Sequence, residues 1–353
     1  MTVQASTLSQ PASYEFCNSQ NMDLFWDKIT EEMMPAAAKD SVLPQKEIHG
    51  NFILMYHPEA RQRYMSEPLY QDNDQSVLFN PLTAYSDLIQ LHPDARDYDF
   101  VSFFIDPVKL DSNQANYYVP FRNIASGINF PPQMMVSHPN DYPFGDRIAG
   151  FQVFGRKTPD TRTLLHEIGH AWCAYTTFKD PATGEHGCTD LLDETLKHWS
   201  RHFDCGRSCM EYDRTKWIKQ GNKRYKLEGV AQDNFEYGDL DLYLMGLLPK
   251  EQVKPVTLIY PENNLVPLEG VTYEVKTKEI SIAEIMADQG ERQATNGRSE
   301  ATLKQLWVVV SADHQSAKNR ADSLSALQQN FPAQYHKATR NLGSLQLNLR
   351  NGG

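Results

Sequence analysis

The feature that most constrains the fold of this 353-residue chain is the pattern H-E-x-x-H at residues 166–170, which lies inside an apolar run. The apolar residues around it predict a helix with one buried side, begun by Thr161 or Thr163. On a helix, residues four apart lie on one face, roughly 6 Å apart along the axis. His166 and His170 can therefore direct their imidazoles at one metal ion.

Glu167 directly follows the first of these histidines. A carboxylate at this position can take a proton from a metal-bound water and pass it to a leaving amine. This combination is typical of zinc metallopeptidases. The alternative interpretation is a pair of hydrogen-bonded core histidines on an amphipathic helix.

Composition limits the classes of partner. The chain has 34 Lys plus Arg against 45 Asp plus Glu, a net charge of −11, and no long basic run, so a nucleic acid is not expected as a partner. No stretch approaches 18 consecutive apolar residues, and residues 1–10 lack both a basic and an apolar region. We therefore expect no membrane partner and no signal peptide. The compartment stays open, either the cytoplasm or export by a signal-independent route, and the sequence could also lack its leader.

The chain has an odd number of cysteines, which are Cys17, Cys173, Cys188, Cys205 and Cys209. One interpretation is mostly free thiols in a reducing compartment. The other is a local disulfide, Cys205 to Cys209 or Cys188 to Cys205, or a second metal site.

The half of the chain before the motif is rich in predicted strands. Residues 1–20 are expected to be flexible and residues 22–39 helical. Strands are predicted at 51–56, 98–105, 117–123 and 148–154, with loops at 67–80 and 130–144. Strands followed by an H-E-x-x-H helix are typical of the N-terminal half of a zincin. In such folds a sheet edge accepts an extended substrate. Residues 148–154 or 117–123 are the candidates for that edge, with an interior strand as the alternative.

The half after the motif mixes helices and strands. The predictions are a turn-rich segment at 179–187, a helix at 191–203, a helix at 240–248 ended by Pro249, hairpin strands over 253–282, a short helix at 282–287, a buried strand at 306–311, a helix at 316–342 broken near Pro332, and a closing strand at 345–349.

A catalytic zinc needs a third protein ligand. The metzincin extension would require Gly and His where this chain has Cys173 and Thr176, so that class is excluded. The candidates lie downstream and are His186, Glu194, His198, His202, Asp239 and Asp241. We favour His198, with Asp241 as the alternative because a carboxylate on an apolar helix must cap, pair or ligate.

Two tyrosines are candidates for a catalytic hydrogen-bond donor. Tyr243 or Tyr175 could stabilise the oxyanion that forms beside the metal. The alternative for each is a core tyrosine with a tethered hydroxyl. Met245 is expected to be a core residue rather than a methionine turn.

These motifs occur in an order that resembles a little-characterised bacterial family of zincin-like metallopeptidases. The matching segments are 164–172 (LLHEIGHAW), 198–200 (HWS), 208–211 (SCME) and 240–247 (LDLYLMGL), and the resemblance runs from about Tyr98 to Trp307. It implies that His198 and Asp241 belong to the site region with the H-E-x-x-H residues.

The sequence thus predicts an α+β, zincin-like fold with a twisted mixed sheet and an active-site helix. It predicts a single catalytic domain over 21–353, with subdomains at about 21–178 and 179–353. The predicted function is a zinc metallopeptidase, an endopeptidase rather than an exopeptidase, acting on protein or peptide substrates, as a general protease or as a secreted or effector protease. The alternative is a catalytically silent zinc-binding or interaction protein whose structural metal uses ligands such as Cys205 and Cys209. Zn²⁺ is the expected ion because imidazole ligands suit it.

Overall fold

The structure is a computed structural model, and it describes residues 42–66, 78–110, 116–129, 139–155, 158–211, 213–231, 234–262, 266–293 and 301–349. The flexible segment predicted at 1–20 and the helix predicted at 22–39 lie outside these residues, as do most of the loops predicted at 67–80 and 130–144.

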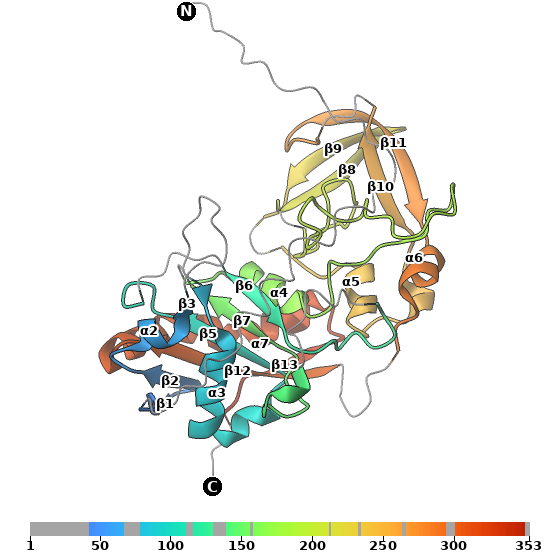
Figure 1. Cartoon of the computed structure of the whole chain (residues 1–353). Helices are drawn as coiled ribbons and strands as arrows, with labels where there is room; N and C mark the ends of the chain where they lie inside the picture. Colours follow the sequence, from blue (N-terminus) through green and yellow to red (C-terminus); the bar gives the residue numbers. More distant parts are fainter. Residues whose placement is uncertain are drawn as a thin grey trace, which may run out of the picture.

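A seven-stranded mixed sheet forms the larger of two bodies, at the lower left of Figure 1. Its four central strands are parallel, in the order β2 (Phe52–Tyr56), β12 (Thr302–Ser311), β5 (Phe100–Ile105) and β7 (Gly150–Phe154). Antiparallel strands flank them, β1 (Gln45–His49) beside β2 and β6 (Tyr117–Pro120) beside β7. The short β13 (Ser344–Gln346) pairs with the start of β12. The α+β class is therefore confirmed.

The central strands are the ones the sequence predicts best, because both of their faces are buried. All six residues of β5 and all five of β7 are inaccessible to solvent. Such strands form continuous runs of apolar and aromatic residues bounded by turn residues. Of the two candidates for the sheet edge, 117–123 provides the edge strand β6 and 148–154 provides the interior strand β7.

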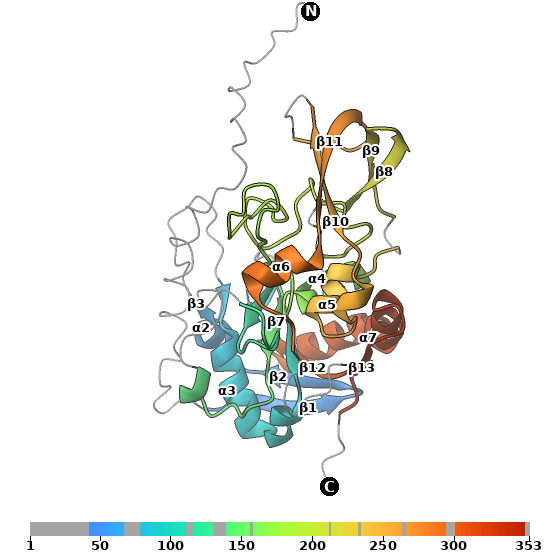
Figure 2. The same ribbon diagram turned by 90° about the vertical axis from the view of Figure 1, so that its right-hand side faces the viewer.

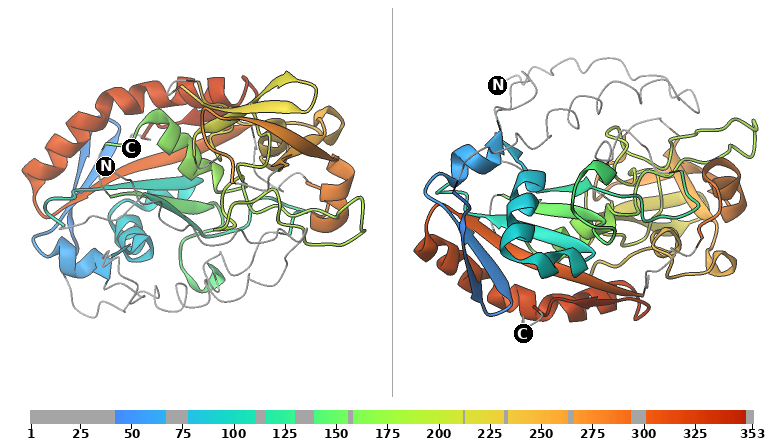
Figure 3. Two further views of the ribbon diagram at one scale, coloured as in Figure 1. Left: turned by 90° about the horizontal axis from the view of Figure 1, so that it is seen from above. Right: turned by 60° about the horizontal axis from the view of Figure 1, so that its bottom comes forward.

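Helices cover both faces of this sheet, as Figures 2 and 3 show. Phe100 and Phe104 of β5 pack on the side of α4 (Thr161–Gly169) and α7 (His314–Ala338). The alternate residues of the same strand pack on the side of α2 (Ala60–Tyr64) and α3 (Pro81–Leu91). Because successive side chains of a strand point to opposite faces, the sheet separates two hydrophobic cores.

The second body is built around a smaller antiparallel sheet, at the upper right of Figure 1. Its order is β10 (Val256–Pro261), β11 (Thr272–Ile280), β9 (Arg224–Gly229) and β8 (Thr215–Gly221). The hairpin strands predicted over 253–282 are confirmed as β10 and β11. The helices α5 (Asp239–Leu244) and α6 (Ile282–Gln289) lie between this sheet and the larger body, and both were predicted, α5 as a longer helix.

The remaining regular elements are short. The 3₁₀ turns occur at Pro93–Asp97, Pro139–Asp141 and Lys250–Gln252, and β3 (Met65–Ser66) pairs with β4 (Leu78–Phe79).

The helix predicted at 191–203 is wrong. This segment forms turns and isolated bridges, with Leu192 opposite Trp199 and Phe203 opposite Leu258. The buried positions have a spacing that also suits a helix, but their backbone groups bond to distant segments, for example Trp199 N–H to the Met210 carbonyl at 3.1 Å. Tertiary pairing overrides the local pattern here.

The break predicted near Pro332 is also wrong, because α7 is continuous through this proline. The buried residues Gln328, Phe331 and Tyr335 continue one stripe across it. A proline removes one hydrogen bond of a helix, and burial of this stripe holds the helix together on both sides.

The last described segment, 301–349, returns to the larger body. The buried strand predicted at 306–311 is confirmed as part of β12, which lies between β2 and β5 at the centre of the seven-stranded sheet. The buried backbone N–H and C=O groups of a central strand need partners on both edges, and β2 and β5 supply them. The segment 179–353, predicted as one subdomain, is thus divided between the two bodies. Among the helices of the described residues, none has the length and apolar character needed to cross a membrane.

Candidate metal centre

Helix α4 begins at an aspartate, and the predicted starter Thr161 is its first residue. The Asp160 carboxylate accepts hydrogen bonds from the backbone N–H and the hydroxyl of Thr163, both at 2.7 Å. This satisfies one of the N–H groups that the first turn of a helix leaves free. Leu165 and Ile168 are buried in the core on the sheet side. The apolar side of the helix is therefore fixed, and so is the direction of its histidines.

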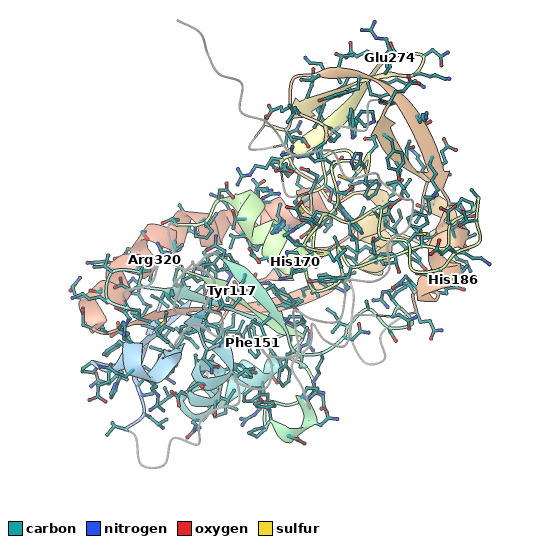
Figure 4. All side chains as sticks on the ribbon, turned by 45° about the horizontal axis from the view of Figure 1, so that its top comes forward. Tyr117, Phe151, His170, His186, Glu274 and Arg320 are labelled. Carbon is teal, nitrogen blue, oxygen red and sulfur yellow. The ribbon has the colours of Figure 1, made fainter. Side chains whose placement is uncertain are left out.

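The imidazoles of His166 and His170 converge, as their four-residue spacing predicts. Their Nε2 atoms are 3.1 Å apart, and their ring centroids are 4.6 Å apart. Both residues are only 7% exposed. Figure 4 places His170 between the two bodies.

His198 joins these two histidines from the irregular loop 189–211. Its ring centroid is 5.0 Å from that of His166 and 5.2 Å from that of His170. One ligand nitrogen from each of the three imidazoles lies within 4.8 Å of the others. Within the part of the chain that the structure describes, this is the single cluster with the geometry of a metal site.

An oxygen atom lies close to the Nδ1 atom of each of these imidazoles. The three pairs are His166 with the Cys209 carbonyl at 2.8 Å, His170 with the Cys173 carbonyl at 3.3 Å, and His198 with the Asp193 carboxylate at 3.0 Å. These oxygens only accept hydrogen bonds, so each Nδ1 carries the proton and each Nε2 keeps its lone pair. Two lone pairs facing each other at 3.1 Å repel unless a cation lies between them. The donor set therefore fits a metal ion held by three Nε2 atoms.

The protonation states suit this role. Burial, reinforced by repulsion from the neighbouring imidazoles, lowers the pKa of His166 and of His170 well below the usual value. Both rings are neutral at pH 7 and able to ligate. Burial alone would raise the pKa of Asp193, but the hydrogen bonds it accepts, that of His198 first among them, outweigh burial, so the pKa is lowered. Asp193 is thus an anionic partner that orients His198, and no sequence pattern pointed to this role.

Glu167 is 5% exposed and shares the helix with the two histidines. Burial raises the pKa of Glu167 to about 8, against the opposing effect of the nearby guanidinium of Arg162. Arg162 is itself buried and donates to the carbonyl oxygen of Glu211. A carboxyl group with a pKa near neutrality can both accept and return a proton, which is the property required of a general acid and base.

Asp241, the alternative third ligand, has its carboxylate turned to other groups. It accepts hydrogen bonds from Trp199 Nε1 at 2.7 Å, Ser208 Oγ at 2.6 Å and the Gly238 backbone N–H at 2.6 Å. The cluster of converging ligand atoms includes His198 and does not include Asp241. Both belong to one region, because Trp199 follows His198 directly.

The two candidate tyrosines lie in different places. The Tyr243 hydroxyl accepts a hydrogen bond from the Arg292 backbone N–H at 2.8 Å, and Tyr243 lines a cavity of about 400 Å³ that none of the three histidines lines. The Tyr175 hydroxyl is 3.3 Å from His170 Nδ1, on the side of the ring away from the cluster. The catalytic role predicted for Tyr243 stays a prediction. Met245 is buried, as expected for a core residue.

The remaining candidate ligands are engaged elsewhere or stay without a metal role. His186 pairs with Asp288 at 3.1 Å and lies at the far edge of the second body in Figure 4. The His202 ring stacks on Tyr260, with Nδ1 3.0 Å from the Ile259 carbonyl. Asp239 pairs with Arg340 at 2.6 Å. Glu194 is not part of the converging cluster.

The disulfides predicted between Cys205 and Cys209 and between Cys188 and Cys205 are wrong. Cys173, Cys205 and Cys209 are free and buried. Neither Cys205 nor Cys209 belongs to the converging ligand cluster. Cys209 contacts the site through its carbonyl oxygen, which bonds to His166 Nδ1. Cys188 is disulfide-bonded, and neither Cys205 nor Cys209 is its partner.

Comparison with known proteins gives no relative to argue from: no protein-family model, curated protein or solved structure matches this chain.

Proposed function

We propose that this protein is a zinc-dependent metallopeptidase with a zincin-like fold. The observation that carries the proposal is the convergence of one ligand nitrogen from each of three imidazoles, two of them from the helix that carries Glu167, while the Nδ1 of each imidazole faces an oxygen. Three protein ligands leave one position of a tetrahedral zinc open, which distinguishes a catalytic site from a structural one. Two of the ligands and the acid/base group come from one helix, as in H-E-x-x-H enzymes.

His166, His170 and His198 would hold the metal. Zinc bound there would lower the pKa of a water molecule and polarise the scissile carbonyl. Glu167 accepts a proton from the attacking water and delivers it to the leaving amine nitrogen, so one carboxyl group serves both halves of the reaction. Arg162 limits the rise of the pKa of Glu167 and so helps keep a fraction of the carboxyl groups ionised at neutral pH.

The edge strand β6 supports a polypeptide as the substrate. Among the described strands, β6 pairs with β7 alone, and α4 lies beside it. An extended peptide can add to such an edge through backbone hydrogen bonds, which recognise the chain without requiring one side chain. A substrate bound in this way would run past the three histidines. This arrangement suits an endopeptidase, because a strand edge has no closed end.

The test compares Glu167→Gln with Glu211→Gln and the wild type. Both glutamates are buried, but the Glu211 carboxylate bonds to Thr215 and is not part of the converging ligand cluster. Elemental analysis gives the zinc content, and mass spectrometry of an unbiased peptide library gives the cleavage rate. We expect stoichiometric zinc in all three proteins. Cleavage should be lost by a factor of about 10²–10⁴ in Glu167→Gln alone.

Three outcomes would contradict the proposal. Full cleavage by Glu167→Gln would remove the acid/base role, and a folded wild type without zinc would remove the metal. Zinc without any cleavage in the wild type would favour the silent zinc-binding protein instead.

A further inference from the structure

We propose that Asp241 is the positioning residue of the metal centre, which sets the geometry of two of the three histidine ligands through two separate arms. The inference rests on the proposed function, because it concerns the same metal. Asp241 does not touch the ligand cluster, and it acts through Trp199 and Ser208.

The position of Asp241 is fixed by its helix. It is the third residue of α5 and is 1% exposed. Its carboxylate accepts from the Gly238 N–H at the start of the helix, which anchors the side chain to its own backbone. The leucines on either side, Leu240 and Leu242, are buried in the core. The carboxylate is therefore a fixed point to which flexible segments can attach.

The first arm leads to His198. Trp199 is 1% exposed, and its indole N–H donates to Asp241 Oδ1 at 2.7 Å. The Trp199 backbone N–H bonds to the Met210 carbonyl, so both ends of this residue are tied. Because His198 is the next residue in a loop without regular structure, the position of Trp199 determines where the imidazole lies.

The second arm leads to His166. The Ser208 hydroxyl donates to Asp241 Oδ2 at 2.6 Å and accepts from the Met210 N–H at 3.1 Å. Cys209 lies between Ser208 and Met210, and its carbonyl oxygen accepts a hydrogen bond from His166 Nδ1. The orientation of that carbonyl depends on the tight turn that Ser208 and Asp241 close. The Asp241 carboxylate thus links His198 to the Cys209 carbonyl, which is the acceptor that orients His166.

An amide cannot replace this carboxylate. The Trp199 indole and the Gly238 N–H are donors only, and they approach different oxygens of Asp241. In Asp241→Asn, either orientation of the amide points its NH₂ at one of these donors. Asp241→Asn therefore loses either the hydrogen bond from Trp199 or the one from the Gly238 N–H, while the volume of the side chain stays the same.

The experiment measures zinc affinity of the full chain by competition with a chromophoric chelator, for the wild type, Asp241→Asn, Trp199→Phe and Ser208→Ala. The matched control is Asp87→Asn. Asp87 is equally a buried carboxylate with side-chain donors, Arg63 and Tyr64, but it lies on α3 on the other side of the sheet. The ligand field is read from the visible absorption of the Co²⁺-loaded proteins.

We expect Asp241→Asn to weaken zinc binding by about 10- to 100-fold and to change the Co²⁺ spectrum. Trp199→Phe and Ser208→Ala should each give part of this loss. Asp87→Asn should lower the free energy of unfolding while zinc affinity and spectrum stay those of the wild type. A folded Asp241→Asn protein with wild-type affinity and spectrum would overturn the inference.

A metal-free measurement separates this inference from the proposed function. In the metal-free wild type, ¹H–¹⁵N spectra should show His166 and His198 as Nδ1–H tautomers, because their Nδ1 atoms face acceptors. Asp241→Asn should mix the tautomers of both rings, and Asp87→Asn should not. If the wild type takes up no zinc, the proposed function fails, whereas unchanged tautomers in Asp241→Asn contradict the positioning role.

Discussion

The proposed metal centre draws on two regions that hold their histidines in different ways. Helix α4 supplies His166 and His170 through its own backbone, with one capping aspartate. The loop 189–211 supplies His198 with no regular structure. Its backbone bonds to side chains of α4, to the backbone of β10 and to other parts of the loop itself. A helix fixes the spacing of its ligands locally, whereas a loop must obtain the same precision from buried polar contacts. The loop ligand should therefore be the more sensitive of the two to changes at a distance.

The largest expected effect tests whether the loop supplies a ligand at all. His198→Ala should lose stoichiometric zinc, since two imidazoles leave the ion short of the three protein ligands that hold a catalytic zinc. His202→Ala, four residues along the same loop, should keep it, because His202 stacks on Tyr260 away from the cluster. Elemental analysis of the folded proteins measures both. Zinc retained in His198→Ala and lost in Asp241→Ala would transfer the ligand role to the helix α5.

The next effect concerns the stability of the loop. Glu211 is 2% exposed, and burial raises its pKa to about 7, from an ordinary value of 4.5. Since the folded pKa lies above the unfolded one, its contribution to stability is intact below about pH 4.5 and is lost as pH rises to about 7. Glu211→Gln cannot ionise, and it can still bond to Thr215. Its free energy of unfolding relative to the wild type should therefore rise by about 2–3 kcal/mol between pH 4.5 and pH 8.

Urea denaturation at several pH values measures this difference. A constant difference across the range would show that the Glu211 carboxyl titrates normally. A matched exchange on the exposed surface, Glu251→Gln, should give no trend.

The smallest effect concerns the contact between helix and loop. A Cβ atom on Gly169, the last residue of α4, would overlap Met210 of the loop and press on Tyr237. Gly169→Ala should therefore destabilise the protein by about 1–2 kcal/mol, after a gain in helix propensity of about 1 kcal/mol. Adding Met210→Ala should recover part of this loss, and a double-mutant cycle measures the coupling. Strictly additive effects would mean that the helix and the loop do not press on each other at this point.

Sequence patterns predicted well the helices and strands whose positions along the chain are set by burial alone. The motif helix and strands β2, β5, β7 and β12 were found because burial gives them clear apolar patterns. Helix α3 was missed although its capping residue Asn80 and the following Pro81 are recognised start signals. The strands β1, β8 and β9 were missed because they are partly exposed and rich in charged residues, which weakens the alternation.

By itself the sequence determined which chemistry is available: two histidines and a glutamate at helical spacing, and an apolar core large enough to hold them. Tertiary structure alone decided which distant groups join them. Asp193, the Cys209 carbonyl and the carboxylate of Asp241 act through hydrogen bonds between segments far apart in the chain. A helix repeats every 3.6 residues and leaves a pattern, but a carbonyl group is present in every residue and leaves none. The selection of His198 over the other candidates was therefore made by packing of the loop against α4 and α5.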